Sequence, residues 1–171
     1  MHSFTELVDR CAAFTLAALN EANERTIDAL QTSGATPLAK TLQMIQLQKT
    51  VLAVGMFSLF EASLQGELQC RNGFKKAKSI LENEKKLDLK RSFDDLYLAV
   101  NVLKHGHGES YDLLVARAGD LPFKVKLPGQ LFFQEGDVSE VFALVQVDDS
   151  FVQHCADVIR QVQEVVQEKM A

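Results

Sequence analysis

Apolar residues that recur three or four positions apart are the strongest constraint on the fold of this chain. This spacing places them on one face of a helix. It predicts long helices over residues 3–31, from Thr36 through at least residue 60, over 88–105, and from Asp149 or Ser150 toward the end. Thr36 is expected to act as N-cap and Pro37 to be the first helical residue, since proline is tolerated there. Short helices are expected within the basic stretch and near residues 110–117.

The second of these helices contains a segment, residues 51–60, that is apolar on most sides. A helix that is apolar all round is usually buried on more than one face. The segment therefore predicts one of two arrangements. Either this helix lies at the centre of a bundle, or it also meets a second subunit, as in a symmetric homodimer.

The helical pattern is interrupted once, before the last helix. Phe123, Val125 and Leu127 alternate with two lysines, a period of two that is typical of a strand, and Pro128 precedes a glycine in a turn-like pair. A second β-like run follows at 141–147. We therefore expect one mainly α domain, residues 1–171, that forms an up-down four-helix bundle with a small β-hairpin or flap inserted at 121–147.

Charge is unevenly distributed along the chain. The whole carries −5, which does not favour a nucleic-acid-binding protein, but residues 71–91 hold eight basic and three acidic residues, a net charge of +5. Two interpretations remain open: a solvated helix face, or a docking patch for phosphate. The lysines that would form such a patch for RNA are Lys75, Lys76, Lys78, Lys85 and Lys86.

Three cysteines, Cys11, Cys70 and Cys155, show no paired spacing, so a disulfide framework is not expected and a reducing compartment fits better. Cys11 and Cys155 fall on apolar helical stripes. The N-terminal stretch is interrupted by charged residues, and the apolar run at 51–60 is half the length that a bilayer requires. The expectation is a cytoplasmic protein that does not enter a membrane.

One cluster of residues with chemical potential lies at the end of the third long helix. Asn101 and His105 are four apart and share a helix face, and Lys104 precedes a histidine followed by glycine, His107 and glycine. A purely structural explanation of Lys104 and His105 is that cations in the last turn of a helix interact favourably with the helix dipole. Metal binding through His105, His107 and Glu109 is a weaker alternative, because their spacing matches no defined ligand set.

The residues around Asn101 and His105 resemble the motif of the HEPN superfamily, one form of which is Arg-Asn-x-x-x-His. Asn101 and His105 match its asparagine and histidine, while Val100 occupies the arginine position. The resemblance implies an antiparallel helical bundle that dimerises. In active members two such motifs form an RNA-cleaving site across the interface, with no metal and no cofactor. Histidine can transfer a proton near neutrality, but Val100 cannot hold a phosphate as arginine does.

The same resemblance implies an acidic or polar residue facing the motif. Glu61, within the apolar part of the second helix, is the candidate to orient His105 or bind Lys104; alternatively it reaches solvent at the edge of its stripe. The functional hypothesis is a HEPN-like dimer that binds or acts on RNA in a toxin or phage-defence setting, with an antitoxin-like partner. The second hypothesis is a non-catalytic helical interaction module.

Overall fold

The computed structural model describes residues 3–34, 36–130 and 143–170, and this part of the chain is mainly helical. Its elements are α1 (Phe4–Thr32), α2 (Thr36–Glu67), α3 (Gly73–Asn83), α4 (Leu87–His105), α5 (Glu109–Val115), the 3-10 helix η1 (Ala118–Asp120) and α6 (Asp149–Met170). The four long helices begin close to the expected positions. Within the described ranges, no helix is both long enough and apolar enough to cross a membrane.

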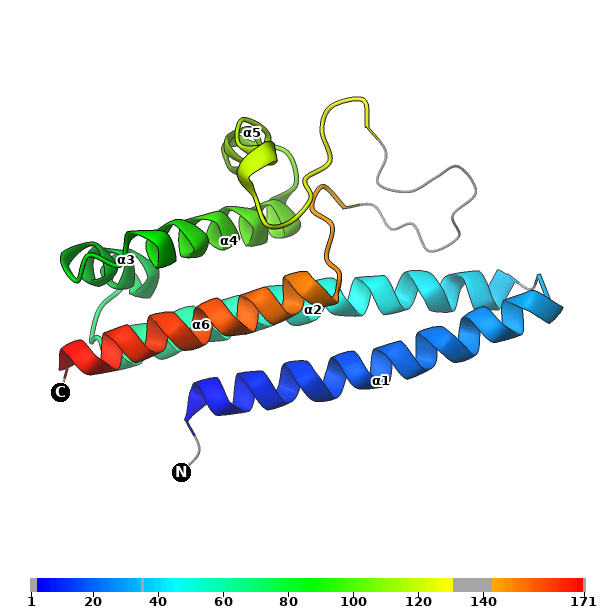
Figure 1. Ribbon diagram of the computed structural model, residues 1–171, viewed down its shortest axis with the longest axis horizontal. Coiled ribbons are helices and arrows are strands. Elements are labelled where there is room, and N and C mark those ends of the chain that lie inside the picture. Colours follow the sequence, from blue (N-terminus) through cyan, green and yellow to red (C-terminus); the bar gives the residue numbers. More distant parts are fainter. Residues whose placement is uncertain (1–2, 35, 131–142, 171) are drawn as a thin grey trace.

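The long helices α1, α2, α4 and α6 alternate in direction (Figure 1). Helices α2 and α6 form the centre, with α1 against both on one side and α4 against both on the other. Helix α3 packs against α2, α4 and α6 at the end of the bundle where the C-terminus lies. The expected up-down arrangement of helices is therefore present.

The centre of the molecule contains a cluster of aromatic rings. Phe57 and Phe60 of α2, Phe74 of α3 and Phe93 of α4 lie with ring centroids 5.2 to 6.2 Å apart. Phe57, Phe60 and Phe93 are fully buried. Burying each such ring contributes about 1.5–3 kcal/mol, so this cluster fixes how α3 and α4 lie on α2.

Helix α1 presents a different face to the core than its most obvious apolar stripe suggests. Val8, Ala12, Leu16 and Leu19 are buried. Cys11, which was predicted to lie on an apolar stripe, is exposed, and so are Leu7 (53 %) and Phe14 (78 %), which recur with it at helical spacing. Two apolar stripes lie side by side on this helix, and spacing alone does not tell which one meets the core.

The predicted β-hairpin is not formed by the described residues of 121–147. They contain no strand, only an isolated antiparallel bridge between Val125 and Val145. The alternating apolar side chains instead pack onto the bundle, as shown by Phe123, whose ring lies 5.2 Å from that of Phe151 in α6. Because these side chains cover the core, the segment is no flap standing outside it. Residues 131–142 of the predicted insertion lie outside the described part.

Helix α6 begins where expected, but a different residue caps it. Asp148 accepts a hydrogen bond of 2.9 Å from the backbone N–H of Phe151, the role expected of Asp149 or Ser150. Asp149 instead lies 2.7 Å from Lys49 Nζ and accepts a bond of 2.6 Å from Asn20, which ties α6 to α2 and α1. Burial raises the pKa of Asp149, but the hydrogen bonds from Lys49 and Asn20 outweigh it and lower that pKa below its usual value.

Candidate functional site

The outer face of α4 carries the residues of the motif. Asn101 and His105 follow Tyr97 at four-residue intervals, and Lys104 lies seven after Tyr97, so all four share one face. Lys104 and His105 are exposed, while Tyr97 and Asn101 are half-buried. Gly106 ends the helix with φ 75°, a left-handed conformation that glycine adopts without strain. The motif therefore lies at an exposed helix end.

Val100 belongs to the opposite side of the helix. It is 5 % exposed and packs in the core. The position that holds arginine in the HEPN motif thus contributes to the stability of this bundle, and it presents no cation on the face of Asn101 and His105. Lys104 is the cation on that face of α4.

Helix α3 crosses α4 close to this face. The ring of Phe74 lies 5.8 Å from that of Tyr97, and Lys78 Nζ lies 4.0 Å from the Tyr97 ring centroid. Asn101 and His105 follow Tyr97 by one and two turns, about 6 and 12 Å along the axis at 1.5 Å per residue. The packing of α3 therefore places Lys78 beside Tyr97, on the face of α4 that carries the motif, while Lys75 and Lys76 are exposed near the start of α3.

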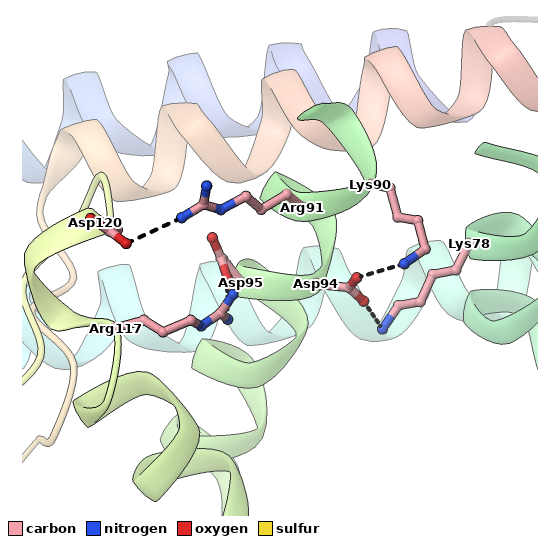
Figure 2. Close-up of polar contacts among 7 residues, drawn as sticks. All are labelled: Lys78, Lys90, Arg91, Asp94, Asp95, Arg117 and Asp120. Carbon is pink, nitrogen blue, oxygen red and sulfur yellow. Dashed lines mark hydrogen bonds and ion pairs between the residues drawn. The ribbon is translucent and has the colours of Figure 1, made fainter. Parts of the chain in front are cut away.

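Several cations of the basic stretch are already paired within the protein (Figure 2). Asp94 lies 2.6 Å from Lys78 Nζ and 3.4 Å from Lys90 Nζ. Arg91 pairs with Asp120 at 3.4 Å. The exposed side chains of Lys75, Lys76 and Lys104 have no such partner in the part of the chain that the structure describes, so their positive charges are available to an anion.

Two of the five predicted lysines lie elsewhere. Lys85 and Lys86 form the turn between α3 and α4, and Lys86 occupies the N-cap position of α4. His105 follows Lys86 by nineteen residues, about 28 Å along a helix. The structure therefore divides the predicted patch into Lys75, Lys76 and Lys78 on α3, where Lys78 contacts Tyr97, and Lys85 and Lys86 at the end of α4 opposite the motif.

Glu61 is also distant from the motif. Its backbone oxygen adjoins Gly73 at the start of α3, where a Cβ would lie 2.8 Å away. The preceding Phe60 packs against Phe93, which comes twelve residues, about 18 Å, before His105. The structure does not bring Glu61 to His105 or Lys104, because α2 runs antiparallel to α4 and carries Glu61 away from the motif (Figure 1).

His107 does not complete a metal site with its neighbours in the described residues. Its ring lies edge-on to Tyr111 with centroids 4.8 Å apart, and the hydroxyl of Tyr111 donates to the backbone oxygen of Lys126. No group of three or more potential ligands, among His, Cys, Asp and Glu, is placed to hold a metal ion in that part of the chain. The loop after α4 thus packs onto the segment that follows α5.

Charged and titratable residues that sequence analysis did not select lie between α4, α6 and η1. Asp95 is 3 % exposed and pairs with Arg117 (Figure 2); burial raises its pKa against the attraction of Arg117 and Arg91. His154 of α6 is half-buried, and its Nε2 is buried without a hydrogen-bond partner among the described residues. Burial lowers the pKa of His154. The signal for His154 was available, since it lies three residues after Phe151 and four before Val158 on the buried stripe of α6.

Comparison of the chain with protein-family models, with curated proteins and with solved structures gives no match. The functional argument therefore rests on the geometry of the α3–α4 face, defined as Lys75, Lys76, Lys78, Tyr97, Asn101, Lys104 and His105.

Proposed function

We propose that this chain is a HEPN-like helical protein that binds RNA through the α3–α4 face without cleaving it. The observation that carries the proposal is the crossing of α3 over α4 at Tyr97. This contact places Lys78 beside Tyr97, on the face of α4 that also carries the half-buried Asn101 and the exposed Lys104 and His105. A basic patch beside an aromatic ring suits a single-stranded nucleic acid.

Each residue type on this face has a matching contact on RNA. Lys75, Lys76 and Lys104 can neutralise phosphates and release counterions. The amide of Asn101 can donate to and accept from a base edge or a ribose hydroxyl. Lys78 Nζ lies over the ring of Tyr97, 4.0 Å from its centroid, so a cation and an aromatic ring adjoin each other on this face. The face would therefore bind the backbone and contact bases without a metal or cofactor.

Cleavage is left out of the proposal because the face lacks the second catalytic group. Histidine alone can move a proton to or from a ribose hydroxyl. The developing charge on the phosphate also needs a forked cation, and the arginine position is the buried Val100. Lys104 supplies only a point charge. The proposal therefore includes RNA binding and excludes RNA cleavage.

Two pairs of substitutions test the binding proposal. Lys75→Gln with Lys76→Gln removes two exposed charges from the start of α3, and Lys85→Gln with Lys86→Gln removes two charges from the turn between α3 and α4. We expect the first pair to weaken binding of a fluorescent single-stranded RNA at least tenfold and to reduce the salt slope by between one and two. The second pair should change affinity less than threefold. Equal losses would indicate only a diffuse charge effect, and no binding at 50 mM salt would refute the proposal.

A separate assay tests the absence of cleavage. The purified protein is incubated with total RNA and a chelator, alone and as the His105→Ala variant. We expect intact RNA in both reactions. Cleavage by the unaltered protein that His105→Ala abolishes would show that this site is an active ribonuclease and that Val100 does not prevent the chemistry.

A non-catalytic interaction module is the second candidate function. It is favoured by apolar side chains that remain exposed on α1 and α2, among them Phe14, Val51 and Leu59. The toxin or phage-defence setting and an antitoxin-like partner belong to the first proposal. Co-expression with the product of an adjacent gene, followed by purification of the complex, tests that part.

A further inference from the structure

A single carboxylate on α4 is shared by two lysines of the basic stretch (Figure 2). Asp94 Oδ1 lies 2.6 Å from Nζ of Lys78 on α3, and Asp94 Oδ2 lies 3.4 Å from Nζ of Lys90, one turn earlier on α4. The side chains of Asp94 and Lys78 are 32 % and 21 % exposed. Because water reaches both groups only in part, their attraction is screened less than that of a pair on the open surface. Asp94 therefore fixes the ammonium group of Lys78 against α4.

The ammonium group that Asp94 fixes also covers an aromatic ring. Lys78 Nζ lies 4.0 Å from the ring centroid of Tyr97, three residues after Asp94, and 5.7 Å from that of Phe93. The ring of Phe74 is nearly perpendicular to that of Tyr97, with the two centroids 5.8 Å apart. A base that stacks on this side of the Tyr97 ring needs the place that Lys78 Nζ occupies. The pair of Asp94 and Lys78 thus closes this side of the ring to a base.

We propose that Asp94 restrains RNA binding at the α3–α4 face by holding Lys78 over the ring of Tyr97. Because it concerns the same face and the same ligand, this restraint rests on the proposed function. While the pair persists, the charge of Lys78 is neutralised by Asp94, and the covered side of the Tyr97 ring is closed to bases. Contacts to phosphate then come from the exposed lysines of the face, Lys75, Lys76 and Lys104.

An RNA phosphate competes poorly with the carboxylate of Asp94 for Lys78. A phosphodiester carries one negative charge, as the carboxylate does, so it attracts the ammonium group no more strongly. The carboxylate is already attached to the protein, whereas RNA loses translational and rotational freedom when it takes the same position. Removing the charge of Asp94 should therefore release Lys78 for a contact with phosphate that the unaltered chain does not make.

Asp94→Asn tests this restraint, because asparagine keeps the size of the side chain and lacks its charge. We expect this variant to bind a short fluorescent single-stranded RNA about tenfold more tightly, with a salt slope steeper by about 0.7, the value for one further phosphate contact on a single strand. Asp88→Asn is the matched control, because it makes the same charge change six residues earlier on α4, where the side chain lines the groove with α6. It should leave the affinity within about threefold and the slope unchanged.

A second background shows whether Asp94 acts through Lys78. In a chain that carries Lys78→Gln, the further change Asp94→Asn should alter the affinity less than about threefold, because the lysine that it would release is absent. Circular dichroism of each variant checks that the helices persist.

Tyrosine fluorescence reports whether the ring of Tyr97 becomes open to a base. The chain contains two tyrosines and no tryptophan, so in Tyr111→Phe the emission comes from Tyr97 alone. Stacking of a base on the ring should quench this emission. We therefore expect saturating RNA to quench it when Asp94→Asn is added and to leave it nearly unchanged when Asp94 is retained.

The outcomes separate failure of the restraint from failure of the proposed function. RNA binding that Asp94→Asn weakens or leaves unchanged would overturn the restraint, while RNA binding itself would stand. Equal gains from Asp94→Asn and Asp88→Asn would also overturn it, and so would a gain that persists in Lys78→Gln, since Asp94 would then act only through general charge. No binding by the unaltered chain or by Asp94→Asn at 50 mM salt would refute the proposed function, and the restraint with it.

Discussion

His154 projects from α6 toward the start of α4, where it lines a groove with Leu87, Leu89 and Ser92. Burial lowers its pKa in the folded protein, against the attraction of Asp157 and Asp95, so the unfolded chain binds more protons below pH 6.5. The contribution of His154 to the free energy of unfolding should therefore be complete above about pH 6.5 and decrease as the pH falls toward the lowered pKa. We expect His154→Leu to remove this decrease between pH 7.5 and 5.5, measured by urea unfolding.

His105 provides the control for this experiment because it is the exposed histidine of the motif. His105→Gln should leave the difference between the two pH values unchanged. A pH dependence that persists in His154→Leu would mean that other groups, such as the buried Asp95, determine it.

At the level of single residues, sequence analysis predicted that Asn101 and His105 share a helix face, but it gave no prediction for the charged residues inside the bundle. Asn101, Lys104 and His105 lie on the exposed end of α4 as their spacing predicted. Nothing in the sequence indicated that Lys49 is buried, because a lysine in an apolar helix usually extends its amine to solvent. Its burial depends on Asp149, one hundred residues later, and no local pattern reveals such a contact.

At the scale of elements, helix α6 depends on its first turn. Asp148 is its N-cap, so Asp148→Ala should lower the free energy of unfolding by about 1 kcal/mol. Ser150→Ala, two residues later, should change it by less than about 0.5 kcal/mol. Chemical unfolding of the two variants distinguishes the caps. A larger loss for Ser150→Ala would contradict the assignment of Asp148.

The close packing of α3 against α2 requires a glycine, Gly73, as the first residue of α3. A Cβ on Gly73 would lie 2.8 Å from both the backbone oxygen of Glu61 and the Cβ of Leu64. We expect Gly73→Ala to lower the free energy of unfolding by about 1–3 kcal/mol, the usual cost of overpacking, as measured in urea. Gly66→Ala, where the space is open, should not lower it. If both variants have the same free energy of unfolding, the packing of α3 does not depend on this close approach.

The helices could be predicted from sequence more accurately than the way they pack. Caps, glycines and apolar spacing predicted helix starts within a residue or two of Thr36 and Asp149, and the end at His105, because these signals are local. The segment around Val125 was predicted as a hairpin, since alternation fits a strand and equally fits an irregular segment that buries every second side chain. The tertiary packing decided between the two.

At the scale of the whole molecule, a homodimer formed through the outward side of α2, where Val51 is 63 % exposed, would produce an effect of RNA length. A dimer carries two α3–α4 faces, so an RNA long enough to reach both binds through avidity, whereas a short RNA meets one. Val51→Lys should therefore weaken binding of a 40-nucleotide RNA at least tenfold and leave that of a 10-nucleotide RNA within twofold, measured by fluorescence anisotropy. Equal affinities for the long RNA would show that the faces act singly.

The exposure of Cys11 on α1 makes its thiol a natural reporter. Cys155 is fully buried, and burial raises the pKa of its thiol, so it should react slowly with disulfide reagents. Cys11 is exposed in the single subunit and would be covered in a homodimer that uses this side of α1. Its rate of modification should then fall as the protein is concentrated, so a thiol that the chain already carries can distinguish the free from the covered form.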